Sequence, residues 1–150
     1  MDKIEIISMT YEDIDDVVII ENESFSVPWS HRGFEDSLNS KYAKFFVAKF
    51  EEKIVGYIGL YLVGDAGDIT NVAVSSQYRR KGIAGRLIEK VIMYAKENNI
   101  SCINLEVRPS NTSAISLYTK YDFKEIGMRK NFYTKPTEDA LLMQREIIEQ

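Results

Sequence analysis

A basic turn between a strand and a helix constrains the fold of this chain more than any other stretch. Residues 69–74 read Ile-Thr-Asn-Val-Ala-Val, which is β-branched and apolar enough for a buried strand. A polar turn at residues 75–78 leads into three cations and two glycines within residues 79–85. From Ile83 onward, apolar residues recur at helical spacing, at Leu87, Val91 and Ala95. The order is therefore strand, basic turn, small-residue turn and helix.

This order suits the binding of a diphosphate. The first amides of a helix have no intrahelical partner, and the helix dipole places partial positive charge there. Gly82, Ala84 and Gly85 leave the backbone open to an anion, and the cations at 79–81 add charge beside it. The Gly-Lys-Ser/Thr ending of a P-loop is missing. The G-x-G-x-x-G pattern of a dinucleotide-binding fingerprint, just after the first strand of a βαβ unit, is also missing. A solvated basic turn that begins an ordinary helix is the alternative interpretation.

Residues 79–84, Arg-Arg-Lys-Gly-Ile-Ala, resemble the R/Q-x-x-G-x-G/A turn of the GNAT N-acetyltransferases. The strand before this turn and the long helix after it lie where that family has them. Further stretches are similar to one branch, the bacterial ribosomal-protein-alanine N-acetyltransferases, and together they cover nearly the whole chain: Glu23-Ser24-Phe25 with Pro28-Trp29-Ser30, residues 69–74, Leu105-Glu106-Val107-Arg108 with Ser110-Asn111, Leu117-Tyr118 with Phe123, and Asp139-Ala140 with Met143.

The resemblance implies an α/β (α+β) GNAT fold in a single domain over residues 1–150. Its mixed central sheet would have about seven strands, helices on both faces and a parallel strand pair that splays apart. The strand–helix–strand order also predicts that 68–74 and 100–107 are parallel, after an antiparallel half-sheet. Strands are expected at 3–9, 44–50, 53–62, 68–74, 100–107, 123–133 and 140–147, and helices from Thr10, from Ser30, from Gly82 to about Asn98, and from Ser110 or Asn111 to about Lys120.

By resemblance, the cofactor is acetyl-CoA. Backbone groups freed at a bulge would pair with the pantetheine amides as another strand does, and an amide near Val74 would face the thioester oxygen. Asn111 would hydrogen-bond the cofactor, although a simple helix cap explains it as well. The expected cofactor-binding residues are Val72, Ala73, Val74, Arg79, Arg80, Lys81, Gly82, Ile83, Ala84, Gly85 and Asn111.

Glu106 lies within a strand in which residues 103, 105 and 107 share one face. A carboxylate this deep in a strand pattern needs a reason, because burying it unpaired is costly. One explanation is an ion pair, for instance with Arg108. The family uses the glutamate of this motif as a general base, and an α-ammonium with a pKa of about 8 needs only modest help.

Tyr118 is the candidate general acid. It follows Asn111 by seven residues on a predicted helix, so the two share a side. A phenol with a pKa of about 10 is protonated at neutral pH and can donate to a departing thiolate. A core tyrosine is the alternative. The family usually has glycine where Asp122 stands, and Asp tolerates the left-handed conformation that this turn requires.

The acceptor would bind near two aromatic residues. By resemblance, the loop that contains Trp29 helps to form the acceptor groove, and Tyr133 lines its other side. For Trp29 the alternative is a large hydrophobic residue that closes the core.

Composition narrows the remaining possibilities. The net charge of −4 argues against a general nucleic-acid binder. No apolar run approaches the ~20 residues of a membrane span, and residues 1–5 lack signal-peptide features, so we expect a cytoplasmic protein without membrane or nucleic-acid partners. No metal site is expected. Cys102 is the single cysteine and lies in an apolar run, which favours a buried structural thiol.

The resemblance therefore implies direct transfer of acetyl from acetyl-CoA to a protein N-terminal amine, the N-terminal alanine of a small-subunit ribosomal protein. Two alternatives remain. The same fold could acetylate a polyamine, an antibiotic or a lysine side chain. A non-catalytic acyl-CoA-binding sensor would be expected to lack an acid and a base near the thioester.

Overall fold

A mixed seven-stranded sheet forms the centre of the computed structural model, which describes residues 3–147. Its strands lie in the order β1-β2-β3-β4-β5-β7-β6, and every pairing is antiparallel except that of β4 with β5. The four α-helices lie on both faces, as predicted. The strands are β1 Ile4–Ser8, β2 Ala43–Phe50, β3 Lys53–Val63, β4 Ala66–Val74, β5 Cys102–Val107, β6 Lys124–Tyr133 and β7 Glu138–Glu146, and the helices are α1 Ile14–Ser24, α2 His31–Asn39, α3 Ile83–Glu97 and α4 Thr112–Lys120.

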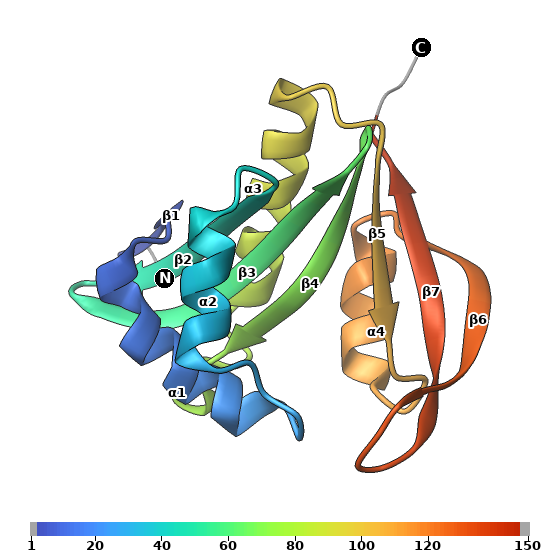
Figure 1. The fold of residues 1–150 in the computed structure, drawn as a ribbon, viewed down its shortest axis with the longest axis horizontal. Coiled ribbons are helices and arrows are strands. Elements are labelled where there is room, and N and C mark those ends of the chain that lie inside the picture. The colour runs from blue at the N-terminus through green and yellow to red at the C-terminus, as the bar shows by residue number, and fades with distance from the viewer. Residues whose placement is uncertain (1–2, 148–150) are drawn as a thin grey trace.

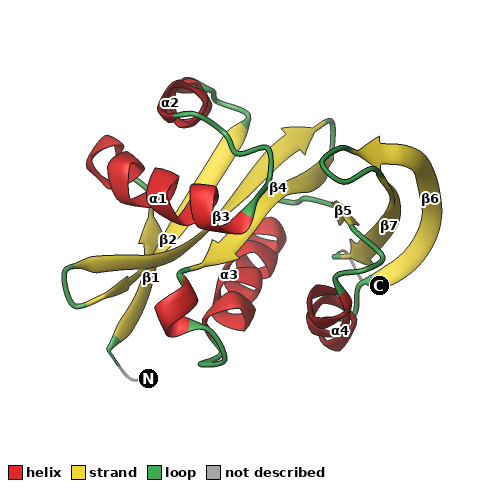
Figure 2. Ribbon diagram, turned by 90° about the horizontal axis from the view of Figure 1, so that it is seen from below, coloured by secondary structure: helices red, strands yellow, loops and turns green. Residues whose placement is uncertain are grey.

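The helices divide the molecule into three layers. Helices α1 and α2 lie on one face of the sheet, and α3 and α4 lie on the other (Figure 2). The buried apolar residues form two clusters, one under α3 and α4 and one under α1 and α2. Apolar stripes explain this: Leu87, Val91 and Ala95 of α3 are fully buried, as their spacing predicts. The sheet is therefore the wall between two cores.

The parallel pair β4–β5 separates after three residues. Ala66, Gly67 and Asp68 pair with residues 102–104, and beyond Asp68 the strand β4 pairs only with β3. Thr70 is an extra residue there, because Gly59 of β3 opposes Asn71 and the next residue of β3 already opposes Ile69. Such a bulge bends a strand and turns it away from its neighbour. The predicted splay is confirmed, and Figure 1 shows β4 and β5 diverging from a common end.

Capping residues precede the helical segments between β1 and β2. Ser30 accepts a hydrogen bond from the amide of Gly33 (3.1 Å) and so caps α2, as predicted. The amide of Thr10 donates to Asp13 (2.9 Å), but the first turn, Tyr11–Asp13, is a 3₁₀ helix, and α1 starts only at Ile14.

Cys102 departs from its prediction. Cys102 is the first residue of β5 and is half-buried. Its sulfur accepts a hydrogen bond from the side-chain amide of Gln144 (3.7 Å). Its neighbour Ile103 takes the fully buried position instead.

Candidate active site

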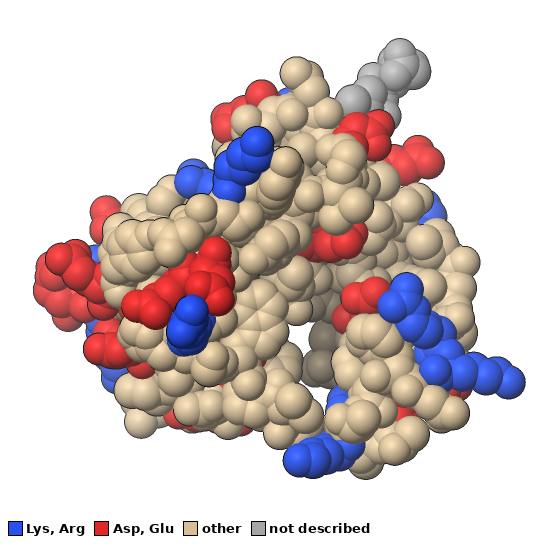
Figure 3. Space-filling view, viewed as in Figure 1, with Lys and Arg blue, Asp and Glu red and all other residues tan. Residues whose placement is uncertain are grey.

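A cleft of about 980 Å³ opens where β4 and β5 diverge. The space-filling view is hollowed between β4 and α4 (Figure 3). Most of the residues predicted for cofactor, catalysis and acceptor line this one cleft, although they come from five separate stretches of the chain: Trp29, Val72, Ala73, Val74, Arg79, Arg80, Gly82, Ile83, Ala84, Gly85, Glu106, Asn111, Tyr118 and Tyr133. Lys81 is not among the lining residues.

The N-terminus of α3 faces the cleft with its backbone accessible. Gly82 precedes the helix in a left-handed conformation (φ 78°), and within the described chain no side chain caps the helix. The amides of the first turn are thus left for a ligand, and the helix dipole makes that position attractive to an anion. Arg79 also braces the turn, because its Nε donates to the carbonyl of Val74 (3.1 Å).

Gly85 has a second reason to be glycine. A Cβ atom there would lie 2.6 Å from the hydroxyl of Tyr121, which itself donates to Glu89 (3.2 Å). A larger residue at this position would therefore displace the Tyr121 side chain from its contact with α3, independently of any ligand.

Glu106 points into the cleft from β5. Residues 103, 105 and 107 are buried and Glu106 is not, so the predicted alternation is confirmed, but its side chain is 36% exposed rather than deep. The suggested ion pair with Arg108 is wrong. Strand β5 ends at Val107, so Arg108 no longer follows its alternation, and it bonds Glu138 of β7 instead (3.2 Å). Glu106 faces Arg129 of β6 at 3.9 Å.

Tyr118 is nearly buried beside the cleft, with 7% of its surface exposed. Burial, and secondarily the neighbouring Tyr133, raise the pKa of Tyr118 far above its usual value, so its phenol stays protonated. Burial, and secondarily the charge of Glu106, raise the pKa of Tyr133 to about 12. Glu106, Tyr133 and Tyr118 all line the same cleft.

Asn111 and Trp29 each have a structural role as well as a place in the cleft. Asn111 caps α4, because its Oδ1 accepts from the amide of Ala114 (3.2 Å). Its amide nitrogen is the group that could donate to a cofactor. Trp29 packs against Phe34 and Phe45, with ring centroids 5.3 and 6.1 Å apart, so the core interpretation and the groove interpretation both describe it.

Glu21 also lines the cleft, although it was not predicted as part of the site. It is 2% exposed, and three donors hold its carboxylate: the amide of Trp29 (2.9 Å), the hydroxyl of Tyr57 and the side-chain amide of Asn71 (3.4 Å). Helical spacing could have revealed it, because it lies seven residues after Ile14 on the buried stripe of α1.

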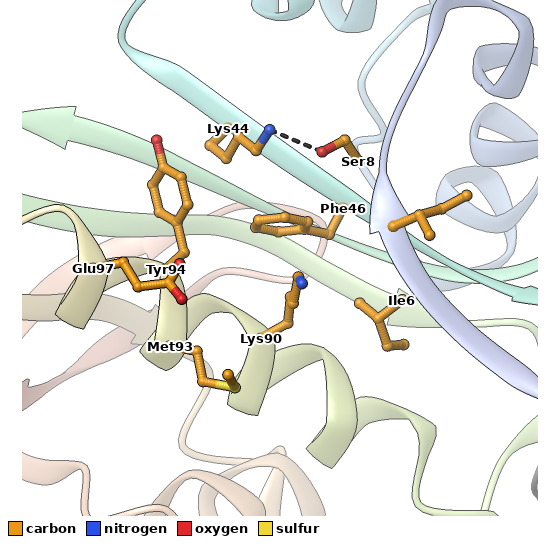
Figure 4. Close-up of a pocket in the computed structure, with 9 residues that line it drawn as sticks. Ile6, Ser8, Lys44, Phe46, Lys90, Met93, Tyr94 and Glu97 are labelled. Carbon is orange, nitrogen blue, oxygen red and sulfur yellow. Dashed lines mark hydrogen bonds between the residues drawn. The ribbon is translucent and has the colours of Figure 1, made fainter.

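A second hollow of about 340 Å³ lies at the other end of the sheet, between β1, β2 and α3. Figure 4 shows the ring of Phe46 between Lys44 and Lys90, and the amine of Lys44 donates to the hydroxyl of Ser8 (2.9 Å). Its lining also includes a carboxylate, Glu97, and a phenol, Tyr94, but Glu97 is exposed and Tyr94 is only half-buried, whereas the phenol of the larger cleft is buried. The cleft between β4 and β5 is therefore the stronger candidate for the active site.

Comparison with known proteins agrees with this geometry. The model of the acetyltransferase (GNAT) family matches residues 14–123. The chain belongs to the GNAT acetyltransferase family. This enzyme is thus an acyltransferase that uses acetyl-CoA, and the cleft has the parts such a ligand requires: an uncapped helix terminus for phosphates and an unpaired strand edge for amides.

Individual relatives cover almost the entire chain. A Bacillus subtilis protein, provisionally named as a ribosomal protein bS18-alanine N-acetyltransferase, is 38% identical over 91% of each chain. The crystal structure of the Escherichia coli ribosomal-protein-S18-alanine N-acetyltransferase superposes with a TM-score of 0.90 at 29% identity, covering 98% of this chain and 96% of that one. A GNAT acetyltransferase from Elizabethkingia anophelis, solved with acetyl-CoA bound, gives a TM-score of 0.80 at 25% identity, covering 97% and 99%.

Residues 3–147 show no helix typical of a membrane span and no cluster typical of a metal site. No helix within residues 3–147 is long and apolar enough to cross a membrane. The same residues contain no group of three or more His, Cys, Asp or Glu side chains arranged to hold a metal ion.

Proposed function

We propose that this enzyme transfers the acetyl group of acetyl-CoA to the N-terminal α-amine of a protein, with the N-terminal alanine of a small-subunit ribosomal protein as its acceptor. The observation that carries the proposal is the cleft itself. A carboxylate, Glu106, and a protonated phenol, Tyr118, share it with the uncapped start of α3. The two most informative relatives, from B. subtilis and E. coli, are both named for acetylating an alanine of ribosomal protein bS18.

Glu106 is the proposed base. An α-ammonium has a pKa of about 8, so at neutral pH it must lose a proton before it attacks the thioester. The partly exposed carboxylate of Glu106 can take that proton through a water molecule. Because Glu106 is partly exposed, this water can reach it without passing through the core. Attack on the thioester carbonyl forms the amide bond and breaks the carbon–sulfur bond, so the coenzyme leaves as a thiolate.

Tyr118 is the proposed acid. The departing thiolate takes the phenol proton, and the thiol is released. Burial favours the neutral form of the phenol and of the coenzyme thiol. Desolvation raises the pKa of Tyr118, and it also raises the pKa of a thiol beside it. A dry position next to the sulfur therefore holds the proton until negative charge develops there.

The lining of the cleft favours a peptide over a polyamine. Its carboxylates are Glu21 and Glu106, whereas three arginines, Arg79, Arg80 and Arg108, also line it. Because Glu21 is already held by three donors, one carboxylate remains for an incoming cation. A polyamine carries several positive charges, and a single available carboxylate can pair with only one of them, whereas a peptide N-terminus carries one charge.

Thiol release over a panel of acceptors tests the proposal. A peptide that begins with alanine should be acetylated, the same peptide with a blocked N-terminus should not, and spermidine or an internal lysine should react far more slowly. Transfer to blocked peptides or to spermidine with equal efficiency would refute the acceptor assignment. Tight binding of acetyl-CoA by calorimetry, with no thiol release on any amine, would instead support a sensor.

Two substitutions test the roles. Glu106→Gln should lower kcat on the order of 10²-fold at pH 7, and less above pH 8, where the amine loses its proton unaided. Tyr118→Phe should lower kcat by a similar factor without changing the KM for acetyl-CoA. Glu125→Gln on β6 and Tyr94→Phe on α3 are the matched controls and should keep full activity. Full activity in both test variants would refute the assignment.

A further inference from the structure

Arg108 joins the end of β5 to the connection between β6 and β7. One terminal nitrogen donates to the carbonyl of Pro136 (2.8 Å), and the other donates to the carbonyl of Thr134 (2.9 Å). The first nitrogen also donates to the carboxylate of Glu138 (3.2 Å). A planar guanidinium can serve three acceptors at fixed angles, which an ammonium cannot do.

Glu138 extends the same contact to the loop before α4. Its carboxylate accepts the amide of Ser110 (2.8 Å) and the hydroxyl of Ser110 (2.9 Å). These bonds, with the charge of Arg108, lower the pKa of Glu138, so it stays ionised at neutral pH. Arg108, Glu138 and Ser110 together, here named the β5–β7 clamp, tie the loop between β5 and α4 to the connection between β6 and β7 at one edge of the cleft.

The clamp also fixes the orientation of Tyr133. The guanidinium carbon of Arg108 lies 4.4 Å from the centre of the Tyr133 ring, a cation–π contact. The ring of Phe132 also packs edge-on against Tyr133, with 5.0 Å between the ring centroids. Both aromatic residues, together with Thr134, line the cleft, as Trp29 does. The wall is therefore set by the clamp and not by burial, because Phe132 and Thr134 are exposed.

We propose that Arg108 is a positioning residue that holds Tyr133 and residues 134–137 as the acceptor-side wall of the cleft. The inference rests on the proposed function, since it assigns this wall to the acceptor. None of the hydrogen bonds of the clamp reaches β4 or the start of α3, which form the proposed cofactor side. Loosening the clamp should consequently affect acceptor binding and spare acetyl-CoA binding.

The test variant is Arg108→Lys, which keeps the positive charge and loses the two guanidinium nitrogens that bind Thr134, Pro136 and Glu138 together. The KM for an alanine-initiated peptide should rise roughly tenfold, because a misplacement of about 1 Å at a reacting centre can cost up to about 10²-fold. The KM for acetyl-CoA should stay within about twofold. Amide hydrogen exchange of a peptide covering residues 131–138 should become several-fold faster, and that of residues 83–97 should not change.

Arg145→Lys is the matched control. Arg145 is a 13% exposed arginine of β7 that donates to the carbonyl of Tyr121 (2.9 Å), away from the acceptor wall. The Arg145→Lys substitution should speed amide hydrogen exchange near residue 121 and leave the KM for the acceptor peptide unchanged. If Arg108→Lys does not fold, Glu138→Gln opens the same clamp from its other end and carries the same expectations.

Three outcomes decide the matter. A higher acceptor KM with faster exchange at 131–138 supports the inference. Faster exchange with an unchanged acceptor KM, or unchanged exchange, overturns it. If the unmodified enzyme acetylates no peptide, the proposed function fails, and the exchange rates alone then decide whether the clamp holds the loop.

Discussion

The buried carboxylate of Glu21 gives the sharpest stability prediction. All three of its partners donate: the amide of Trp29, the hydroxyl of Tyr57 and the side-chain amide of Asn71. An ionised carboxylate accepts at both oxygens, whereas a glutamine has one oxygen and one NH₂ group. Glu21→Gln therefore preserves size and removes one acceptor from a site that supplies only donors.

The magnitude follows from the two glutamine orientations. With its oxygen on the amide of Trp29, Gln places its NH₂ group where Glu21 has the oxygen that serves both Tyr57 and Asn71. The NH₂ group can donate to the Tyr57 oxygen, but the Tyr57 hydroxyl and the Asn71 amide lose their acceptor. The reverse orientation keeps those two bonds and sets NH₂ against the backbone N–H of Trp29. Either orientation leaves at least one donor without its charged acceptor, which costs about 1.5–3 kcal/mol, so we expect a loss of about 2 kcal/mol. In a chain of 150 residues this lowers Tm by about 4–8 °C.

Urea unfolding at pH 7, followed by far-UV circular dichroism, measures this loss. Glu23→Gln, two residues along the same helix and exposed, is the control and should change the free energy of unfolding by less than about 0.5 kcal/mol. A double-mutant cycle with Tyr57→Phe should give a coupling of about 1 kcal/mol or more. If Glu21→Gln is as mild as the control, the hydrogen bonds from the three donors do not stabilise the fold as argued and the reasoning fails.

Three further predictions concern glycines and a phenol. Gly59→Ala should destabilise by about 3 kcal/mol in urea, because its Cβ would lie 2.3 Å from the buried Phe45 ring, whereas Gly33→Ala in α2 meets nothing closer than 3.6 Å and should stabilise by about 0.5 kcal/mol. Gly82→Ala should destabilise by about 1–2 kcal/mol and weaken coenzyme A binding by calorimetry, since φ there is 78°. Burial raises the pKa of Tyr133 to about 12, so its contribution to stability is complete below pH ~10 and is lost as the pH rises toward 12; pH-dependent unfolding should show a smaller loss in Tyr133→Phe.

Local patterns predicted the elements of the fold well. Helix α3 extends over Ile83–Glu97, against an expectation of 82–98, and the parallel pairing of β4 with β5 is confirmed. Asp122 has φ 71°, so the left-handed turn survives without glycine as expected. These features follow from spacing, chain length and turn chemistry, which neighbouring residues determine.

Long-range pairing limited the rest. The place of β7 between β5 and β6 depends on contacts between distant strands, and no local signal encodes it. The same limit explains the error at Glu106: alternation gave its face correctly, but its partner, Arg129, belongs to β6, more than twenty residues away. Glu21 was missed for another reason, because an acidic residue on the buried stripe of α1 was not read as part of the site.

The proposed acid and base owe their different surroundings to one extra residue in β4. Thr70 has no partner on β3, and from there β4 leaves β5, which remains paired with β7 through Val107. The space that opens exposes Glu106 by about a third, while Tyr118 beside it stays dry. With β4 continuing alongside β5, the strand edges would pair with each other and no extended amide ligand could enter. The bulge therefore does more than bend a strand, because it creates both the proposed docking edge for the coenzyme and the contrast in solvation that the proposed proton transfers require.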